Sequence, residues 1–149
     1  MEKQIFNLWN SFRSTRNKKG VWKGCSMLDG FTKSTIRQAC KAHGGPERIL
    51  EAIKNYHLIW HGKEYKWTYA WTLPQLLTRK DKGGIPQIRQ FLPGNFRADT
   101  YLSDSEKTKR ATIERAEAAK NKYELHMKSV PENKIDWRKR RADINAVRN

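Results

Sequence analysis

The sequence predicts an all-α fold, with a compact multi-helix domain over residues 4–102 and a long basic helical extension over residues 103–149. Three observations indicate this. Apolar residues recur at the three- and four-residue spacing of a buried helix face through much of the first 60 residues. Six of the 16 aromatic residues lie between Tyr56 and Trp71, and large aromatic side chains bury the most apolar area. Near residue 102 the composition changes to Ala, Glu, Lys and Arg.

The first predicted element is a short amphipathic helix over residues 4–16. Ile5, Trp9 and Phe12 recur at helical spacing on one side of it. A polar, basic turn follows, and then an irregular stretch over residues 21–30. Three apolar residues of this stretch are expected to pack and anchor it: Trp22, Met27 and Leu28.

Two further helices are predicted on either side of Gly44 and Gly45. Residues 32–43 form one, with Thr32 or Ser34 as its cap. Its expected buried stripe is Ile36, Ala39, Cys40 and His43. The glycines end it, and Pro46 begins a third helix that runs to about Trp60. The stripe of that helix is Ile49, Leu50, Ile53, Tyr56 and Trp60.

Shorter elements complete the predicted domain. The alternation over residues 67–71 fits a short extended piece, and residues 72–75 read as a capping box that opens a short helix. A basic loop over residues 79–84 follows, and then a second short helix over residues 85–92. Phe96 is expected to fold back onto the core.

The predicted extension begins with a long, largely exposed helix over residues 103–128. Asp104 is its expected cap. The apolar stripe is thin: Ile113, Ala116, Tyr123 and Met127. A final basic segment begins near Asp136.

The charge of the chain favours a polyanionic partner, most often nucleic acid. Lys and Arg number 31 and Asp and Glu 15, which gives a net charge of +16. Up to Leu102 there are 18 basic and 7 acidic residues, so the domain itself carries +11 and the extension +5. The alternative is a basic surface that serves solubility.

Four basic clusters are candidates for phosphate contact, and for each one a solvated surface is the alternative. The first is Arg13, Arg16, Lys18, Lys19 and Lys23. The second is Lys33, Arg37 and Lys41. The third is Arg79, Lys80 and Lys82. The fourth is Lys134, Arg138, Lys139, Arg140 and Arg141, beside which Trp137 could stack a base. Tyr65, Trp67 and Trp71 could also stack bases, but their position beside an apolar helix favours packing in the core.

Catalytic and metal chemistry find little support in the residues. His57 and His61 stand four apart, as zinc ligands on a helix do, but with Cys40 and His43 they match no finger spacing. No triad, phosphate-binding loop or acidic pair beside a histidine is present, so we expect neither an enzyme nor a cofactor. No apolar run reaches a membrane span or the core of a secretory signal. Cys25 and Cys40 suggest reduced thiols in the cytoplasm.

Several short motifs, in this order, resemble a known family. They are Leu8–Asn10, Ile36–Arg37 in a basic helix that ends at Gly44, Ile53–Tyr56, Trp71–Leu73 and Phe91–Leu92. The order is similar to that in the C-terminal domains of phage replication proteins of the replisome-organiser and helicase-loader type, which are loosely DnaD-like. The resemblance covers about residues 5–96. It implies a helical, non-enzymatic domain that binds DNA and replication proteins such as the replicative helicase. Unlike the usual members, this sequence has no winged-helix domain before the matching region, and it adds the basic extension.

The leading hypothesis is therefore a DNA-binding phage replication accessory protein in the cytoplasm of a bacterial host. It would hold single-stranded or forked DNA through the basic clusters and dock the replicative helicase or another replication protein. The alternative is a non-enzymatic protein-interaction module that inhibits or regulates a host enzyme.

Overall fold

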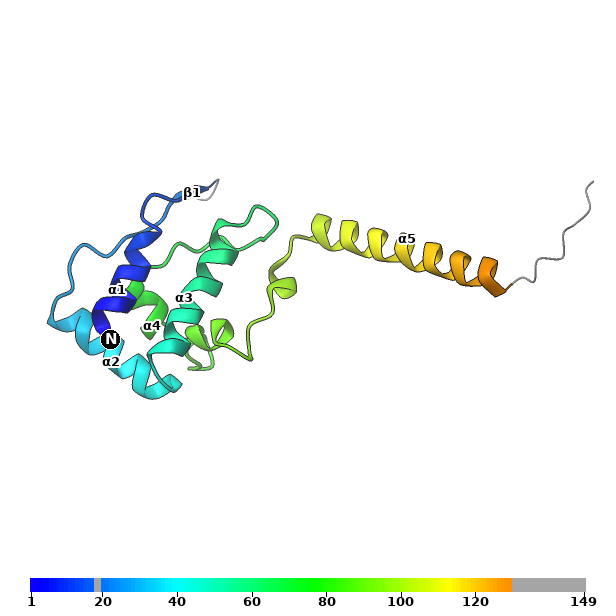
Figure 1. The fold of residues 1–149 in the computed structure, drawn as a ribbon. Coiled ribbons are helices and arrows are strands. Elements are labelled where there is room, and N and C mark those ends of the chain that lie inside the picture. Colours follow the sequence, from blue (N-terminus) through cyan, green and yellow to red (C-terminus); the bar gives the residue numbers. More distant parts are fainter. Residues whose placement is uncertain (18–19, 130–149) are drawn as a thin grey trace, which may run out of the picture. The chain divides into compact units, whose positions relative to one another are not determined.

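A computed structural model describes residues 1–17 and 20–129, and these residues are mostly helical, as predicted (Figure 1). The elements are α1 (Glu2–Ser11), β1 (Arg16–Asn17), β2 (Gly20–Val21), α2 (Gly30–His43), α3 (Pro46–His61), α4 (Leu73–Thr78), the 3-10 helices η1 (Gln87–Phe91) and η2 (Ala98–Tyr101), and α5 (Asp104–Ser129). Met1–Lys107 forms one compact unit, and a second unit begins at Thr108. The predicted final basic segment lies outside the described residues.

Helix α1 ends at Ser11, five residues before the predicted boundary, because its last turn is tied to the loop that follows. The Asn10 side chain donates to the Cys25 carbonyl at 2.9 Å and accepts the Cys25 amide at 2.8 Å. The chain then turns into an antiparallel pair in which Arg16 faces Val21. The sequence did not predict this hairpin.

The irregular loop before α2 is anchored by Trp22, as predicted. The Trp22 indole donates to the Trp9 carbonyl at 2.9 Å, and the Trp9 indole donates to the Lys23 carbonyl at 2.8 Å. Leu28 is partly buried against the core. The prediction that Met27 packs is wrong, since its side chain is 67 % exposed.

Helix α2 begins two residues before the predicted boundary, and its cap is Asp29 rather than Thr32 or Ser34. The Asp29 carboxylate accepts the Thr32 amide at 2.7 Å. This backbone hydrogen bond to the charged form lowers the pKa of Asp29. Helix α2 ends at Gly44, where φ is 84°, a value that glycine adopts without strain.

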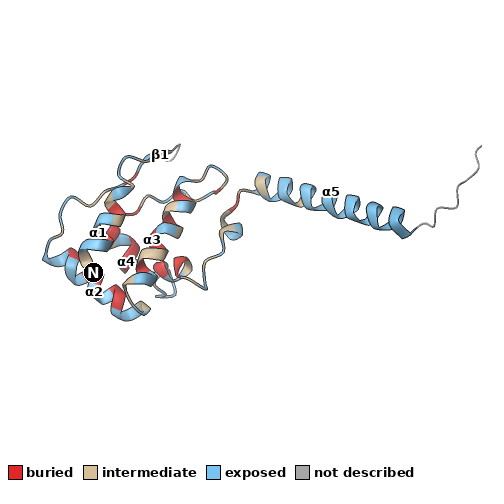
Figure 2. Ribbon diagram, in the orientation of Figure 1, coloured by how far each residue is buried: buried red, intermediate tan, exposed pale blue. Residues whose placement is uncertain are grey.

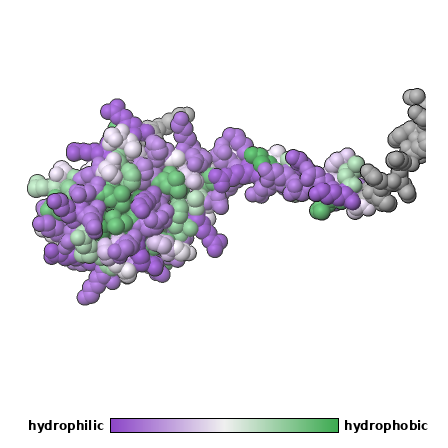
Figure 3. Space-filling view, in the orientation of Figure 1, coloured by the Kyte–Doolittle hydropathy of each residue, from purple (hydrophilic) through white to green (hydrophobic). Residues whose placement is uncertain are grey.

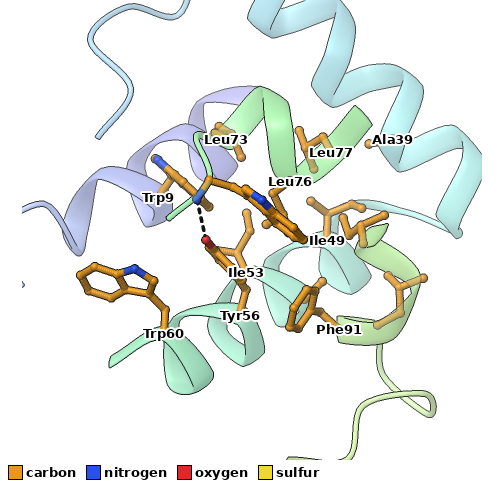
Figure 4. Packing of buried hydrophobic residues seen from close by; sticks show 14 of the residues in the cluster. Trp9, Ala39, Ile49, Ile53, Tyr56, Trp60, Leu73, Leu76, Leu77 and Phe91 are labelled. Atoms are coloured by element: carbon orange, nitrogen blue, oxygen red, sulfur yellow. Dashed lines mark hydrogen bonds between the residues drawn. The ribbon is translucent and has the colours of Figure 1, made fainter. Parts of the chain in front are cut away.

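The core collects on α3 and matches the predicted aromatic stretch (Figure 4). Trp9, Tyr56, Trp60 and Phe91 are fully buried within it. The residues predicted for the α3 stripe are buried except Leu50, which packs at its edge. Buried faces of α1–α4 point toward one another, whereas α5 is exposed along its length (Figure 2).

The Tyr56 hydroxyl fixes the course of the segment after α3. It accepts the Trp71 amide at 2.8 Å and donates to the Tyr69 carbonyl at 2.9 Å. Burial raises the pKa of Tyr56 to about 12, so the hydroxyl keeps its proton. The capping box of Thr72 and Gln75 then opens α4, as predicted. Residues 67–71 are irregular rather than a regular strand.

The basic loop after α4 is a hydrogen-bonded turn. Lys80 pairs with Pro86 as an isolated bridge, and the Asp81 carboxylate accepts the amides of Gly83 and Ile85 at 2.8 and 2.9 Å. The short helix predicted after it is the 3-10 helix η1. Asn55 holds this helix to α3, since its side chain donates to the Phe91 carbonyl at 2.9 Å. Phe96 folds back onto the core, as predicted.

Helix α5 has the predicted extent and exposure. Its cap is Ser103 rather than Asp104, because the Ser103 hydroxyl accepts the Glu106 amide at 3.4 Å. Every residue of the predicted apolar stripe is exposed, and the surface of α5 is mostly hydrophilic (Figure 3). The helix is therefore stabilised by propensity and capping more than by burial.

We expect the stability of the domain to fall as the pH falls from 6.5 toward 4, because of His57. Burial, with a smaller contribution from the charge of His61, lowers the pKa of His57 from 6.5 to about 4. The unfolded chain binds a proton there at higher pH than the folded chain, so the stabilisation is complete above pH 6.5 and is lost as the pH falls through 4. The Phe12 ring stacks on His57 at 3.8 Å, and the Thr15 hydroxyl lies 3.3 Å from its Nε2.

Thermal melts at pH 7.5 and 5 measure this effect. In His57→Phe, which keeps a ring against Phe12, the difference in Tm between the two pH values should shrink. The control is His126→Gln on the exposed face of α5, which should keep the parental difference. An unchanged difference in His57→Phe would show that another group is responsible.

Candidate nucleic-acid interface

The first two predicted basic clusters lie on separate parts of the surface. In the first, Arg13, Arg16 and Lys23 are exposed, whereas Lys18 and Lys19 lie outside the described residues. In the second, Lys33, Arg37 and Lys41 are exposed along α2. Arg37 is not free there, because its guanidinium donates to the Glu2 carboxylate and lowers the pKa of Glu2. Neither cluster adjoins an exposed aromatic pocket of the kind described next.

The third predicted cluster lines a cavity together with three aromatic side chains. This aromatic–basic pocket has a volume of about 340 Å³. Its principal residues are Trp67, Tyr69, Trp71, Arg79, Lys80 and Lys82. The pocket forms where the loop before α4 meets the turn after it, and the Tyr56 hydroxyl and the turn at Asp81 hold the two segments in place.

The three rings of the aromatic–basic pocket form a graded surface from buried to exposed. Trp71 is 6 % exposed, Trp67 is partly buried and Tyr69 is 57 % exposed. Tyr69 and Trp71 stack at 6.0 Å with 21° between their planes. Trp67 stands nearly perpendicular to both, at 5.4 Å from Tyr69 and 5.1 Å from Trp71. The prediction of core packing therefore describes Tyr65 and Trp71, and in part Trp67.

Positive charge stands directly beside these rings. The Arg79 guanidinium carbon lies 5.6 Å from the centroid of the Trp71 ring, within the range of a cation–π contact. Lys80 and Lys82 are exposed on the same turn. The one acidic residue in the lining, Asp81, has a carboxylate oxygen engaged by two backbone amides of the turn. The pocket therefore combines accessible ring surface with an excess of positive charge.

One indole of the pocket has an unmet hydrogen-bonding capacity. Among the described residues no acceptor reaches the buried Nε1 of Trp71. By contrast, the indole of Trp67 donates to the Tyr69 carbonyl at 2.9 Å. A buried donor without a partner is uncommon and suits a site that receives an acceptor from outside.

Sequence reasoning missed Tyr69, Gln87 and Gln90 as members of this pocket. Tyr69 has the same parity as Trp67 and Trp71, so strict alternation would bury all three on one side. The segment is irregular, however, and turns the Tyr69 ring outward. The two glutamines come from η1, which approaches only through the folded chain.

The fourth cluster, Arg138, Lys139, Arg140 and Arg141 with Trp137 and Lys134, lies outside the described residues. Of the histidines considered as metal ligands, His57 and His61 stack at 5.4 Å. Among residues 1–17 and 20–129, no three His, Cys, Asp or Glu side chains are grouped to hold a metal.

The chain was compared with protein-family models, curated proteins and solved structures, and none of them matches it. Within the described part of the chain, no helix combines the length and apolar character needed to cross a membrane.

Proposed function

We propose that this protein binds single-stranded DNA at the aromatic–basic pocket. The observation that carries the proposal is the exposed Tyr69 ring, with Trp67 beside it and three cations on the adjoining turn. Proteins that hold single strands combine stacking rings with a positive path for the backbone. A base that stacks on Tyr69 would bring its phosphates toward Arg79, Lys80 and Lys82.

The wider role proposed is that of a non-enzymatic phage replication accessory protein in the bacterial cytoplasm. The support is the family resemblance together with the net charge of +16. In this role the chain holds single-stranded or forked DNA and docks the replicative helicase or another replication protein. The basic C-terminal segment, with Trp137, would add a second contact to the strand.

A second candidate function is a protein-interaction module that inhibits or regulates a host enzyme. One observation favours it. A larger cavity, lined mainly by apolar and imidazole groups, lies at the C-terminal end of α3 and shares no residue with the aromatic–basic pocket. The two functions are compatible in one chain, because the two cavities are separate.

We expect Tyr69→Ala to weaken binding to single-stranded DNA by about 1–3 kcal/mol, the usual loss for one stacked base. Because stacking releases no counterions, the dependence of affinity on salt should not change. Titration of a fluorescent 15-nucleotide thymidine strand at several salt concentrations measures both quantities.

Tyr69→Phe is the matched control, since it keeps a ring and loses only the hydroxyl. It should bind the strand as the parent does. Both variants should unfold like the parent because the ring is exposed. Parental affinity in Tyr69→Ala would contradict the stacking role of this pocket.

A further inference from the structure

The larger cavity at the end of α3 has a different chemistry from the aromatic–basic pocket. Its volume is about 680 Å³, within the usual range of ligand pockets. Its wall includes Phe12, Arg16, His57, Leu58, His61 and Lys63. We call it the histidine pocket. The residues come from the end of α1, from β1, from α3 and from the turn after α3.

The lining of the histidine pocket is apolar and is built from rings that cover one another. Phe12 stacks on His57 at 3.8 Å with 7° between the planes, and His57 stacks on His61 at 5.4 Å with 9°. Both faces of His57 are therefore covered, which leaves little ring surface for a nucleic-acid base. Leu58 stands beside them on α3 and is 45 % exposed.

Cations surround this apolar lining. Arg16, Lys54 and Lys63 are exposed at the pocket. Lys54 pairs with Glu51 at 3.3 Å, and Glu64 is the one acidic residue of the wall. Among the described residues, no ion pair joins a carboxylate to Arg16 or Lys63. The charge of the rim thus complements a ligand that carries negative groups.

We propose that the histidine pocket docks an acidic segment of a partner protein, with one bulky apolar side chain of that segment seated against Phe12 and Leu58. The apolar lining accounts for the bulky side chain, and Arg16, Lys54 and Lys63 account for the carboxylates. This inference rests on the docking part of the proposed function and gives the chemistry of the partner. It is independent of the DNA-binding part, because the two cavities share no residue.

A labelled peptide of sequence Asp-Asp-Glu-Asp-Leu-Phe tests the inference on the full chain by fluorescence anisotropy. We expect the parent to bind it, and to bind at least tenfold more weakly both a version with Ala-Ala in place of Leu-Phe and a version with Lys in place of the acids. Arg16→Glu with Lys63→Glu should lower affinity for the parent peptide at least tenfold. Leu58→Ala, a change at an exposed position, should lower it severalfold.

The matched control is Lys33→Glu with Lys41→Glu on α2, which changes the net charge equally at exposed positions away from the pocket. It should lower peptide affinity by less than twofold, and binding to the thymidine strand should respond equally to both charge reversals. The proposal is overturned if the parent does not bind the peptide at millimolar concentration, if both charge reversals weaken it equally, or if the Ala-Ala peptide binds as well. Displacement of the peptide by the thymidine strand in Tyr69→Ala would also overturn it and would assign the histidine pocket to nucleic acid.

Discussion

Trp60→Ala should reduce the free energy of unfolding by about 3–5 kcal/mol, the usual loss when a buried large aromatic leaves a cavity. Trp60 is fully buried on α3. The Trp22 ring meets it edge-on at 5.1 Å, and His57 lies 6.3 Å away. Because Trp22 also holds the loop to Trp9, its loss of support should loosen α1 as well as α3. A domain of this size has only about 5–15 kcal/mol of stability, so the loss is a large fraction of the total.

Urea unfolding followed by circular dichroism measures this loss. The control is Tyr123→Ala, which also removes a large aromatic but from a 64 % exposed position on α5. That variant should remain within about 0.5 kcal/mol of the parent. If Trp60→Ala unfolds within 1 kcal/mol of the parent, the assignment of the aromatic stretch to the core is wrong.

The second large effect concerns charge at the aromatic–basic pocket. Replacing Arg79, Lys80 and Lys82 together with Ala should lower the slope of log affinity against log salt by about 2 on single-stranded DNA, at roughly 0.7 for each phosphate contact. At 0.1 M salt this corresponds to about 100-fold weaker binding. The side chains are exposed and the turn is held by Asp81 and backbone bonds, so the fold should be preserved.

The control removes the same charge elsewhere, with Ala in place of Lys107, Arg115 and Lys122 on α5. If only the overall field matters, both triple variants should lose affinity equally, and the assignment of phosphate contacts to the pocket fails. Ala in place of the four cations Arg138, Lys139, Arg140 and Arg141 gives a further comparison. A slope lowered by about 2–3 in that variant would place the C-terminal segment on the strand as well.

Local signals explain why most helices were predictable. The Gly44–Gly45 break, the following proline and the apolar stripe define α2 and α3 within a few residues, and the capping box defines the start of α4. Cap assignments failed where two polar residues compete. Asp29 lies before Thr32, and Ser103 before Asp104, and in each case the earlier side chain reaches the free amides.

Contacts between distant residues explain what the sequence did not predict. The early end of α1 depends on Asn10 and Cys25, which stand 15 residues apart. The outward position of Tyr69 depends on hydrogen bonds from Tyr56 and Trp67 to its carbonyl. The candidate site joins one predicted basic cluster to rings that the sequence assigned to packing, and only the folded chain brings them together.

The central claim is that single-stranded DNA binds at the aromatic–basic pocket, and an NMR titration of the full chain tests it most directly. Increasing amounts of the 15-nucleotide thymidine strand are added, and ¹H–¹⁵N spectra are recorded. We predict the largest shifts at the indole Nε1 groups of Trp67 and Trp71 and at the amides of Tyr69 and residues 79–82. Shifts confined to Lys33, Arg37 and Lys41 on α2 or to the C-terminal segment, with both indoles unmoved, would contradict the account.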